Sequence, residues 1–273
     1  MISLIGIGEF CCSIVDKLQY PQYTPYKVLQ STLGIPALKN AEEYENIKTN
    51  LSNFITDNNK SVSVFVDGSE AISGLILKIL EPVKDRDINI IYIKSDLQLA
   101  SNIEKLQHKV CCNVLQEYAR SGLFKKIIFV DKLKLEQIIG NFSILDYEEK
   151  LTHLIATTYH MINVYANTKP IMTNTLETSD VCRIETLGIS GIQENNIKWF
   201  FDLENINEIT YYFAINSAVL KKEQKLLQTI KKQVKDKQEN NIKVMFGVYE
   251  TQYDESYVYC SGKTKFIQPQ PNS

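Results

Sequence analysis

The sequence predicts an α/β protein with a mostly parallel, Rossmann-like N-terminal sheet, a central helix and a smaller C-terminal α+β domain. Over the first half of the chain, short runs rich in β-branched residues alternate with longer segments of helical periodicity, as in βαβ units. A long apolar helical pattern follows, and beyond it strand patterns outnumber helical ones. The 273 residues provide room for two such domains, because one domain typically contains about 100 to 200 residues.

The first half contains four segments that are too short for helices and rich in strand-forming residues. These candidate strands are Ile2–Ile5, Val62–Val66, Ile88–Ile93 and Ile127–Val130. Apolar side chains three and four residues apart mark the candidate helices between them. These are Glu9–Leu18, Ala41–Phe54, Ala71–Leu80 and Leu99–Ala119. We therefore expect residues 1–143 to form an α/β domain with a Rossmann-like sheet.

The middle of the chain carries a long helical pattern that begins near Asp146 and is apolar on more than one face, until Lys169-Pro170 ends it. A helix of this kind is buried on several sides, so we expect residues 144–170 to connect two domains. Residues 171–267 should form the C-terminal α+β domain, and residues 268–273 a flexible tail.

The C-terminal part contains four candidate strands and two candidate helices. The strands are Val181–Leu187, Ile209–Asn216, Ile242–Glu250 and Ser256–Phe266, and the helices are Gln193–Phe201 and Leu220–Lys237. A short polar turn joins the last two strands, which predicts that they pair as an antiparallel hairpin.

Charge and composition exclude several classes of protein. With 30 Lys+Arg against 32 Asp+Glu, the net charge gives no overall electrostatic attraction to nucleic acid. The 220–237 helix is rich in lysine, but it also has an ordinary apolar core face, so its lysines are expected to be solvated. No apolar run approaches the roughly 20 residues of a membrane span and the N-terminus lacks a secretory leader, so we expect a cytoplasmic protein. The six cysteines match neither a zinc site nor a disulfide framework, and no metal site is expected.

Two glycine-containing turns follow predicted strands, where backbone N–H groups can bind a phosphate. The first is Gly6-Ile7-Gly8-Glu9-Phe10, and the second is Asp67-Gly68-Ser69-Glu70-Ala71-Ile72-Ser73-Gly74. Neither is a Walker loop, and close packing of a helix on a strand explains the same glycines without a ligand. The candidate binding residues in these turns are Gly6, Gly8, Gly68, Ser69, Ser73 and Gly74.

The order of these features resembles the tubulin/FtsZ superfamily over nearly the whole chain. Residues 4–8 look like the opening phosphate loop of that family, and residues 64–74 lie where it has its glycine-rich signature. Residues 126–133 resemble the FtsZ strand that ends in Asn-Asp-Lys-Leu, and residues 244–248 resemble the penultimate FtsZ strand with its Phe-Gly pair. The resemblance implies self-association or assembly with another structural protein. Small divergent members occur in phages, which would allow a virion location.

The resemblance also implies a cofactor and its contacts. It implies GTP or GDP, with Mg bound alongside the nucleotide, and it places Tyr147 and Thr152 near the base and ribose. In the family, the loop after the central helix supplies acids that polarise the attacking water in the neighbouring subunit. Here that loop contains Glu177 and Asp180, with Asp180 as the expected catalytic residue and Glu177 as its partner.

The chain departs from the family where phosphates would bind. Glu9 and Glu70 stand in the two turns, and an unpaired like-charge contact at ~4 Å costs on the order of 1 to 4 kcal/mol. We therefore expect a divergent tubulin/FtsZ-like structural or assembly protein with weak or absent GTP binding. Two alternatives remain open at this point: an active GTPase that forms cytomotive filaments, and an unrelated α/β enzyme that binds a small molecule.

Overall fold

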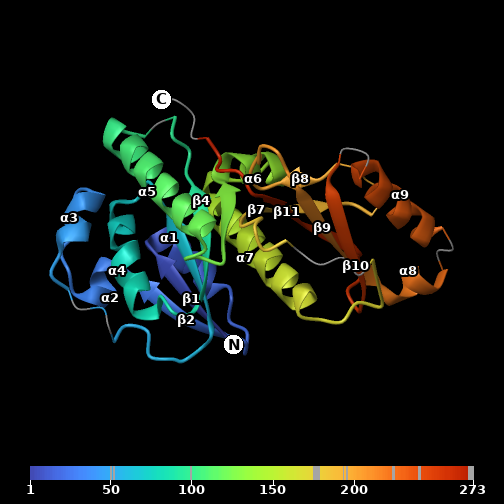
Figure 1. Cartoon of the computed structure of the whole chain (residues 1–273), viewed down its shortest axis with the longest axis horizontal. Helices are drawn as coiled ribbons and strands as arrows, with labels where there is room; N and C mark the ends of the chain where they lie inside the picture. The colour runs from blue at the N-terminus through green and yellow to red at the C-terminus, as the bar shows by residue number, and fades with distance from the viewer. Residues whose placement is uncertain are drawn as a thin grey trace. The chain divides into compact units, whose positions relative to one another are not determined.

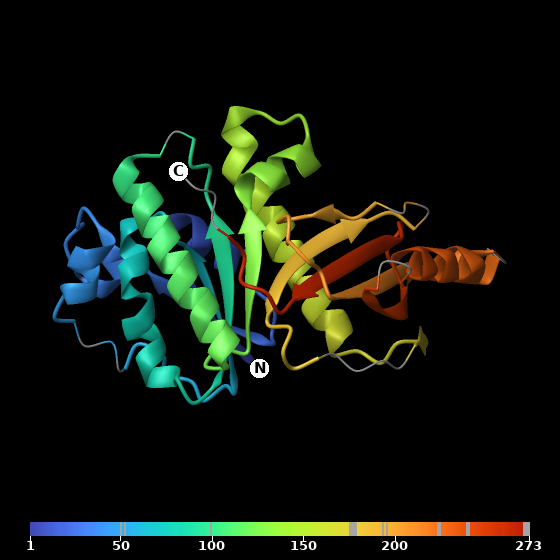
Figure 2. The same ribbon diagram turned by 45° about the horizontal axis from the view of Figure 1, so that its top comes forward.

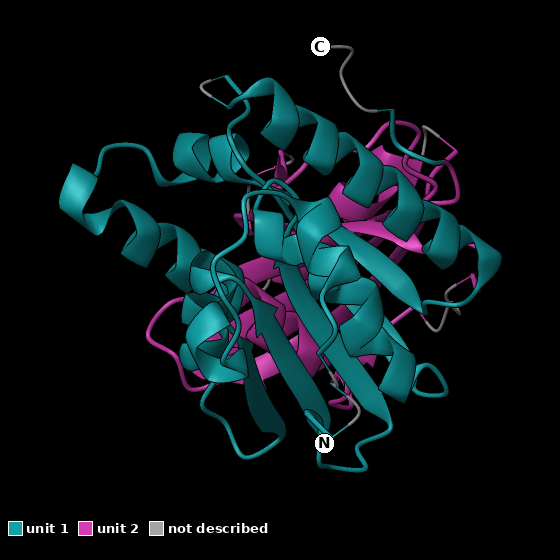
Figure 3. Cartoon of the chain, turned by 90° about the vertical axis from the view of Figure 1, so that its left-hand side faces the viewer, with its two compact units in different colours: residues 1–156, 267–273 teal, residues 157–266 magenta. Residues whose placement is uncertain are grey.

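The protein is described here by a computed structural model that covers residues 1–49, 51, 53–98, 100–174, 179–192, 194, 196–222, 225–238 and 241–269. The chain forms two compact units, coloured separately in Figure 3. Unit 1 comprises Met1–Ala156 and Ile267–Ser273, and unit 2 comprises Thr157–Phe266.

Unit 1 is built on a parallel sheet with the strand order β2-β1-β3-β4-β5 (Figure 1). Its strands are β1 (Ile2–Ile7), β2 (Tyr23–Val28), β3 (Ser61–Asp67), β4 (Asp87–Lys94) and β5 (Lys126–Asp131). The predicted α/β class and parallel sheet are confirmed. Strand β2 was not among the predicted strands; it contains Pro25, which a sheet tolerates here because β2 lies at the edge.

The helices of unit 1 connect these strands. They are α1 (Glu9–Asp16), α2 (Gln30–Leu33), α3 (Ala41–Asn46), α4 (Ile76–Leu80), α5 (Asn102–Ser121) and α6 (Lys132–Ile139), with 3₁₀ turns η1 (Ala71–Leu75), η2 (Glu81–Val83) and η3 (Ile144–Asp146). Helix α5 runs along the sheet beside β4 and β5 (Figure 2). Its ends are encoded locally: Ser101 and Glu104 form a capping box, and Gly122 ends the helix with φ 89°.

The strand order places a topological switch point between β1 and β3. The chain moves from β1 outward to β2, and then returns past β1 to β3, β4 and β5. Right-handed crossovers therefore put α1 on one face of the sheet and the helices of the β3–β5 connections on the other. Ligands of such sheets bind beyond the carboxyl ends of the strands at this point, where the two glycine turns begin.

Both faces of the unit 1 sheet are buried, which explains why its strands are apolar at successive positions. In β3, Val64, Phe65 and Val66 have no exposed surface, and in β4 the same holds for Ile90 and Ile91. A parallel sheet covered by helices on both sides requires this pattern.

Helix α7 (Tyr147–Ala166) starts in unit 1 and continues into unit 2. Unit 2 has a mixed sheet with the order β8-β7-β11-β9-β10-β6. Its elements are β6 (Met172–Thr173), β7 (Ile184–Ser190), β8 (Lys198–Trp199), β9 (Glu208–Asn216), α8 (Ser217–Lys222), α9 (Leu226–Gln238), β10 (Lys243–Thr251) and β11 (Tyr257–Thr264).

Two sequence-based expectations for unit 2 were wrong. The last two strands, β10 and β11, do not form a hairpin, because β9 lies between them, parallel to β10 and antiparallel to β11. The α8–α9 segment makes β9 and β10 a parallel crossover unit, which leaves the other edge of β9 for β11. The helix expected over 193–201 is also absent among the described residues there, where Lys198–Trp199 instead pairs with β7.

The core of unit 2 lies between its sheet and α9. Alternate side chains of β9, including Tyr211 and Phe213, meet those of β10, including Phe246, and α9 adds Ile230 and Val234. The apolar face predicted for the lysine-rich helix is confirmed at Leu226, Ile230 and Val234 of α9, whereas Leu227, expected on the same face, is 41% exposed. The lysines of α9 lie on its remaining surface.

Candidate nucleotide-binding site

The first glycine turn joins β1 to α1, and its two glycines are required by close contacts inside unit 1. A Cβ on Gly6 would lie 2.8 Å from the carbonyl oxygen of Cys11, so Gly6 allows α1 to pack tightly on β1. Gly8 has φ 86°, a left-handed conformation that favours glycine, and it is the N-cap residue of α1 without a side-chain cap.

The space over Gly8 is taken by a side chain of the second turn. A Cβ on Gly8 would lie 1.9 Å from Oε2 of Glu70, so the Glu70 carboxylate packs directly on the Gly8 backbone. In a phosphate loop, the bare glycine backbone at this place contacts the ligand. Here the bare backbone of Gly8 contacts a carboxylate from the same chain.

The glycines of the second turn are also explained by internal packing. A Cβ on Gly68 would lie 1.9 Å from Oη of Tyr92, and a Cβ on Gly74 would lie 2.1 Å from the carbonyl oxygen of Ala41. Ser69 donates a hydrogen bond of 2.6 Å from Oγ to Asp67 Oδ1, and Ser73 is only 2% exposed. These contacts are consistent with the alternative explanation of the glycines, which is that close packing within the chain requires them without a ligand.

A buried ion cluster lies at the carboxyl ends of β3, β4 and β5. Asp67, the last residue of β3, is 1% exposed, and its Oδ2 lies 2.9 Å from Lys132 Nζ. Ser95, which follows β4, donates to the same Oδ2 and lies 2.9 Å from Lys132 Nζ. The Lys132 ammonium also lies 3.9 Å from the ring centroid of Phe10, a cation–π contact.

The two carboxyl groups near Lys132, those of Asp67 and Glu70, have pKa values shifted in opposite directions. Burial by itself would raise the pKa of Asp67, but the Lys132 ammonium and two serine hydroxyls outweigh it and hold the pKa below its usual value. Burial is the main reason that the pKa of Glu70 is raised to about 7, and the negative charge of Asp67 adds to it, partly opposed by Lys132. Asp67 is therefore ionised at neutral pH, while Glu70 is close to half protonated.

Asp67, Ser95 and Lys132 are not among the site residues predicted from the sequence. Each is a polar residue at or just after the carboxyl end of a parallel strand, which is the signal that could have found them. Within the described ranges, no group of three or more His, Cys, Asp or Glu side chains is arranged to hold a metal ion.

Comparison of the whole chain with known proteins identifies the fold. No protein-family model and no curated protein matches the sequence. Among solved structures, the GTPγS-form protofilament of TubZ from Bacillus thuringiensis serovar israelensis is similar with 14% identity and TM-score 0.70, covering 98% of this chain and 89% of that one. The empty FtsZ dimer of M. jannaschii is similar with 10% identity and TM-score 0.70, covering 97% and 88%.

The chain has the tubulin/FtsZ fold. A third solved structure agrees: CetZ from Methanosaeta thermophila has 11% identity and TM-score 0.66, with coverage of 97% of this chain and 86% of that one. At these identities the likeness establishes the fold alone, and the activity must be argued from the residues of this chain. Among the described helices, none is long and apolar enough to cross a membrane.

In this tubulin/FtsZ fold, the two residues expected near the base and ribose begin α7. Tyr147 donates a hydrogen bond of 2.6 Å to Glu136 Oε1, and its ring centroid lies 5.7 Å from that of Phe142. Thr152 is 1% exposed, and its hydroxyl donates to the backbone oxygen of Glu148 at 2.6 Å. The Thr152 hydroxyl thus bonds to its own helix.

Of the two expected catalytic acids, Asp180 lies in the turn before β7 in unit 2. Glu177 lies outside the described residues. Asp180 is exposed, and its backbone oxygen accepts a hydrogen bond of 2.8 Å from Nε of Arg183. The neighbouring Ser179 N–H donates to the Glu208 carboxylate at 3.1 Å, which anchors the end of the loop to β9.

Proposed function

We propose that this chain is a structural or assembly protein of the tubulin/FtsZ type that binds GTP weakly or not at all. The contact of the Glu70 carboxylate with Gly8 carries this proposal. The position that a phosphate would need over the first turn holds an oxygen of the chain itself. A triphosphate does not fit these residues unless Glu70 moves away.

The charges around the turn support the same conclusion. Glu70 is half-buried beside Asp67, and Glu9 and Glu148 lie close enough to raise its pKa as well. Lys132, the nearby cation, is already paired with Asp67. An added phosphate about 4 Å from the ionised Glu70 would be repelled by roughly 1 to 4 kcal/mol, which is about a fivefold to several hundredfold loss of affinity while Glu70 stays ionised. Because the pKa of Glu70 is about 7, protonation of Glu70 limits this loss to about twofold at pH 7 and about tenfold at pH 8.

Self-association is supported by an exposed apolar pair next to this site. Ile144 and Leu145 in η3 are each 93% exposed, directly before α7 begins at Tyr147. Burying two adjacent aliphatic side chains that are almost fully exposed would stabilise a contact with another molecule. The similar solved structures include a TubZ protofilament and a two-stranded TubZ filament, which is consistent with assembly of this chain into polymers.

The test combines labelled-GTP titration of the purified chain with electron microscopy in the presence and absence of nucleotide. We expect no binding at micromolar GTP, and polymers that form without nucleotide. At pH 8, where Glu70 is mostly ionised, Glu70→Gln should increase GTP affinity up to about tenfold, since it removes the repelling charge, whereas the exposed Glu9→Gln should change it less. Micromolar binding by the unaltered chain would contradict the nucleotide part of the proposal.

The assembly part is tested with Leu145→Ser, which removes an exposed apolar side chain and spares the core. We expect this variant to fold normally and to form fewer polymers. The exposed Ile171→Ser in unit 2 is the matched control, because Ile171 is also apolar and is 61% exposed. Equal effects of the two substitutions would argue against an assembly surface at η3.

A second candidate function is an active GTPase, favoured by the exposed carboxylate of Asp180 in the loop before β7. It requires GTP turnover that rises with protein concentration and is lost in Asp180→Ala, because hydrolysis would then depend on a neighbouring subunit. Nucleotide-independent polymers would argue against this candidate.

A further inference from the structure

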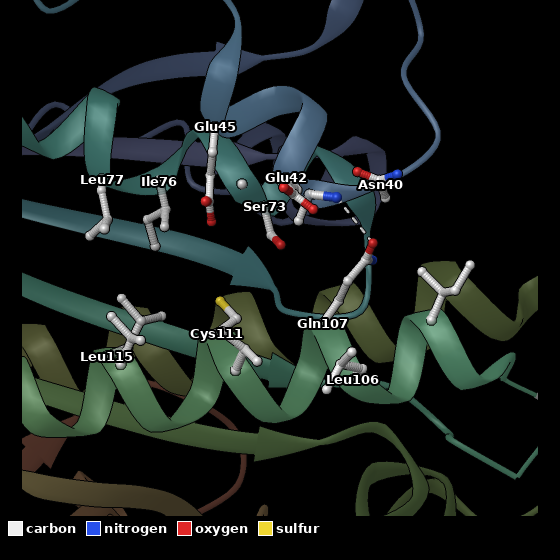
Figure 4. A pocket seen from close by; sticks show the side chains of 15 residues that line it. Asn40, Glu42, Glu45, Ser73, Ile76, Leu77, Leu106, Gln107, Cys111 and Leu115 are labelled. Atoms are coloured by element: carbon white, nitrogen blue, oxygen red, sulfur yellow. Dashed lines mark hydrogen bonds between the residues drawn. The ribbon is translucent and has the colours of Figure 1, made fainter.

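A hollow of about 430 Å³ lies between α5 on one side and η1, α4 and α3 on the other (Figure 4). Most of its lining is apolar. Four of the lining side chains are large, aliphatic and strongly exposed: Leu77 at 40%, Ile103 at 59%, Leu106 at 62% and Val110 at 52%. Three of them come from α5 at spacings of three and four, so they form a single stripe along that helix.

The hollow continues toward the end of α5. A second hollow of about 350 Å³ shares Leu77 with the first and is lined further by Tyr118, Phe124 and Leu123, of which Leu123 is 48% exposed. Helix α5 has 20 residues and is therefore about 30 Å long. We call the surface formed by Leu77, Ile103, Leu106, Val110 and Leu123 the α5 groove. Its length exceeds what a small ligand covers and suits another helix.

Charges of opposite sign mark the two ends of the α5 groove. Glu42 and Glu45 of α3 line the first hollow, and both are exposed and without an ion pair in the described part of the chain. The second hollow, beyond Leu77, is lined by Lys78, the exposed Lys84 and the exposed Glu81. The end of the groove formed by the first hollow is thus acidic, and the end formed by the second hollow carries two lysines against one carboxylate.

We infer that the α5 groove binds the α5 groove of a second copy of this chain, with the two α5 helices antiparallel. A two-fold axis close to Leu77 brings the acidic end of each copy to the Lys84 end of the other. The same operation places the apolar stripe of one α5 in the groove of its partner. This contact is separate from the η3 surface of the proposed function and would pair molecules or polymers sideways.

The contact should be weak. Five half-exposed apolar side chains on each copy are fewer than the roughly 20 to 30 residues per side of a standard stable interface. Repetition along a polymer would strengthen it, because each further contact forms at high effective concentration. Two-fold pairing is closed, so this surface by itself gives dimers rather than open chains.

The test measures the dissociation constant of the dimer by sedimentation velocity in nucleotide-free buffer, with Leu145→Ser in every protein compared so that polymers formed through η3 do not obscure the dimer. Leu106→Glu puts a carboxylate into the middle of the apolar stripe, and we expect the dissociation constant to increase at least tenfold. Leu227→Glu is the control, since Leu227 is 41% exposed on α9 of unit 2, away from the α5 groove in sequence and unit. We expect the control to dimerise as the unaltered chain does.

Charge reversal tests the antiparallel arrangement. Glu45→Lys and Lys84→Glu should each weaken the dimer, because each places like charges opposite one another, and the double variant should restore it. A chain that stays monomeric to about 1 mM overturns the inference, whether a small molecule or another protein covers the groove. Equal dimerisation of Leu106→Glu and the control also overturns it.

The outcomes separate this inference from the proposed function. If Leu145→Ser removes the polymers while Leu106→Glu has no effect on any association, assembly through η3 stands and pairing through the α5 groove is wrong. If Leu106→Glu abolishes the dimer while filaments remain single and intact, the α5 groove is a lateral contact between copies.

Discussion

The Glu70 carboxyl provides the most direct test of the structure, through the substitution Glu70→Gln. Glutamine keeps the size of the side chain but cannot ionise. The folded chain holds Glu70 with a pKa raised from 4.5 to about 7, chiefly because it is buried and secondly because Asp67 is negative. Since one pKa unit corresponds to about 1.36 kcal/mol, ionised Glu70 is destabilising in the folded chain by about 3 kcal/mol.

The direction of the pH dependence follows from proton binding. Between pH 4.5 and about 7 the folded chain retains the Glu70 proton while the unfolded chain has released it. The contribution of Glu70 to the free energy of unfolding therefore falls as the pH rises through this window, and is constant above it. Glu70→Gln should remove this loss, so that the variant gains up to about 3 kcal/mol on the unaltered chain between pH 4.5 and pH 8.

Urea unfolding of both proteins from pH 4.5 to pH 8 measures this difference, and other titrating groups largely cancel because the two chains share them. Glu81→Gln is the matched control, since Glu81 is exposed and lies outside the two glycine turns, and its stability should follow the unaltered chain at each pH. A constant difference between Glu70→Gln and the unaltered chain across the window would refute the reasoning. It would mean that Glu70 ionises as in water and does not rest on Gly8.

Two further predictions concern unit 1. Lys132→Met leaves Asp67 buried without its ion-pair partner and should lower the free energy of unfolding in urea at pH 7 by about 3 to 5 kcal/mol. The control, Lys109→Met at an exposed lysine, should lower it by about 0.5 kcal/mol or less. Equal losses would show that the Lys132–Asp67 pair is not buried. Gln116→Ala removes both hydrogen bonds to the buried backbone of Gln268, which are 2.7 and 3.2 Å long. It should lower the free energy of unfolding by about 1 to 2 kcal/mol and make digestion by carboxypeptidase faster. Unchanged digestion would contradict the contact.

Local sequence was sufficient for the elements whose residues decide their own conformation. The strands of unit 1 were found because β-branched runs fit a buried parallel sheet, and α5 because Ser101, Glu104 and Gly122 encode its ends. The order of turns and strands was sufficient to indicate the tubulin/FtsZ fold, which the solved structures confirm. Where pairing depends on distant segments the sequence failed, as with β2 and the supposed hairpin of β10 and β11.

The candidate site shows the same division. The sequence by itself determined that two glycine turns follow strands of a parallel sheet and that Glu9 and Glu70 stand in them. It could not determine that Glu70 rests on Gly8 while Glu9 remains exposed, or that Lys132 neutralises Asp67. Those facts depend on distances between side chains that are 62 and 65 residues apart in the chain, which only the packing of β1, β3 and β5 into one sheet brings together.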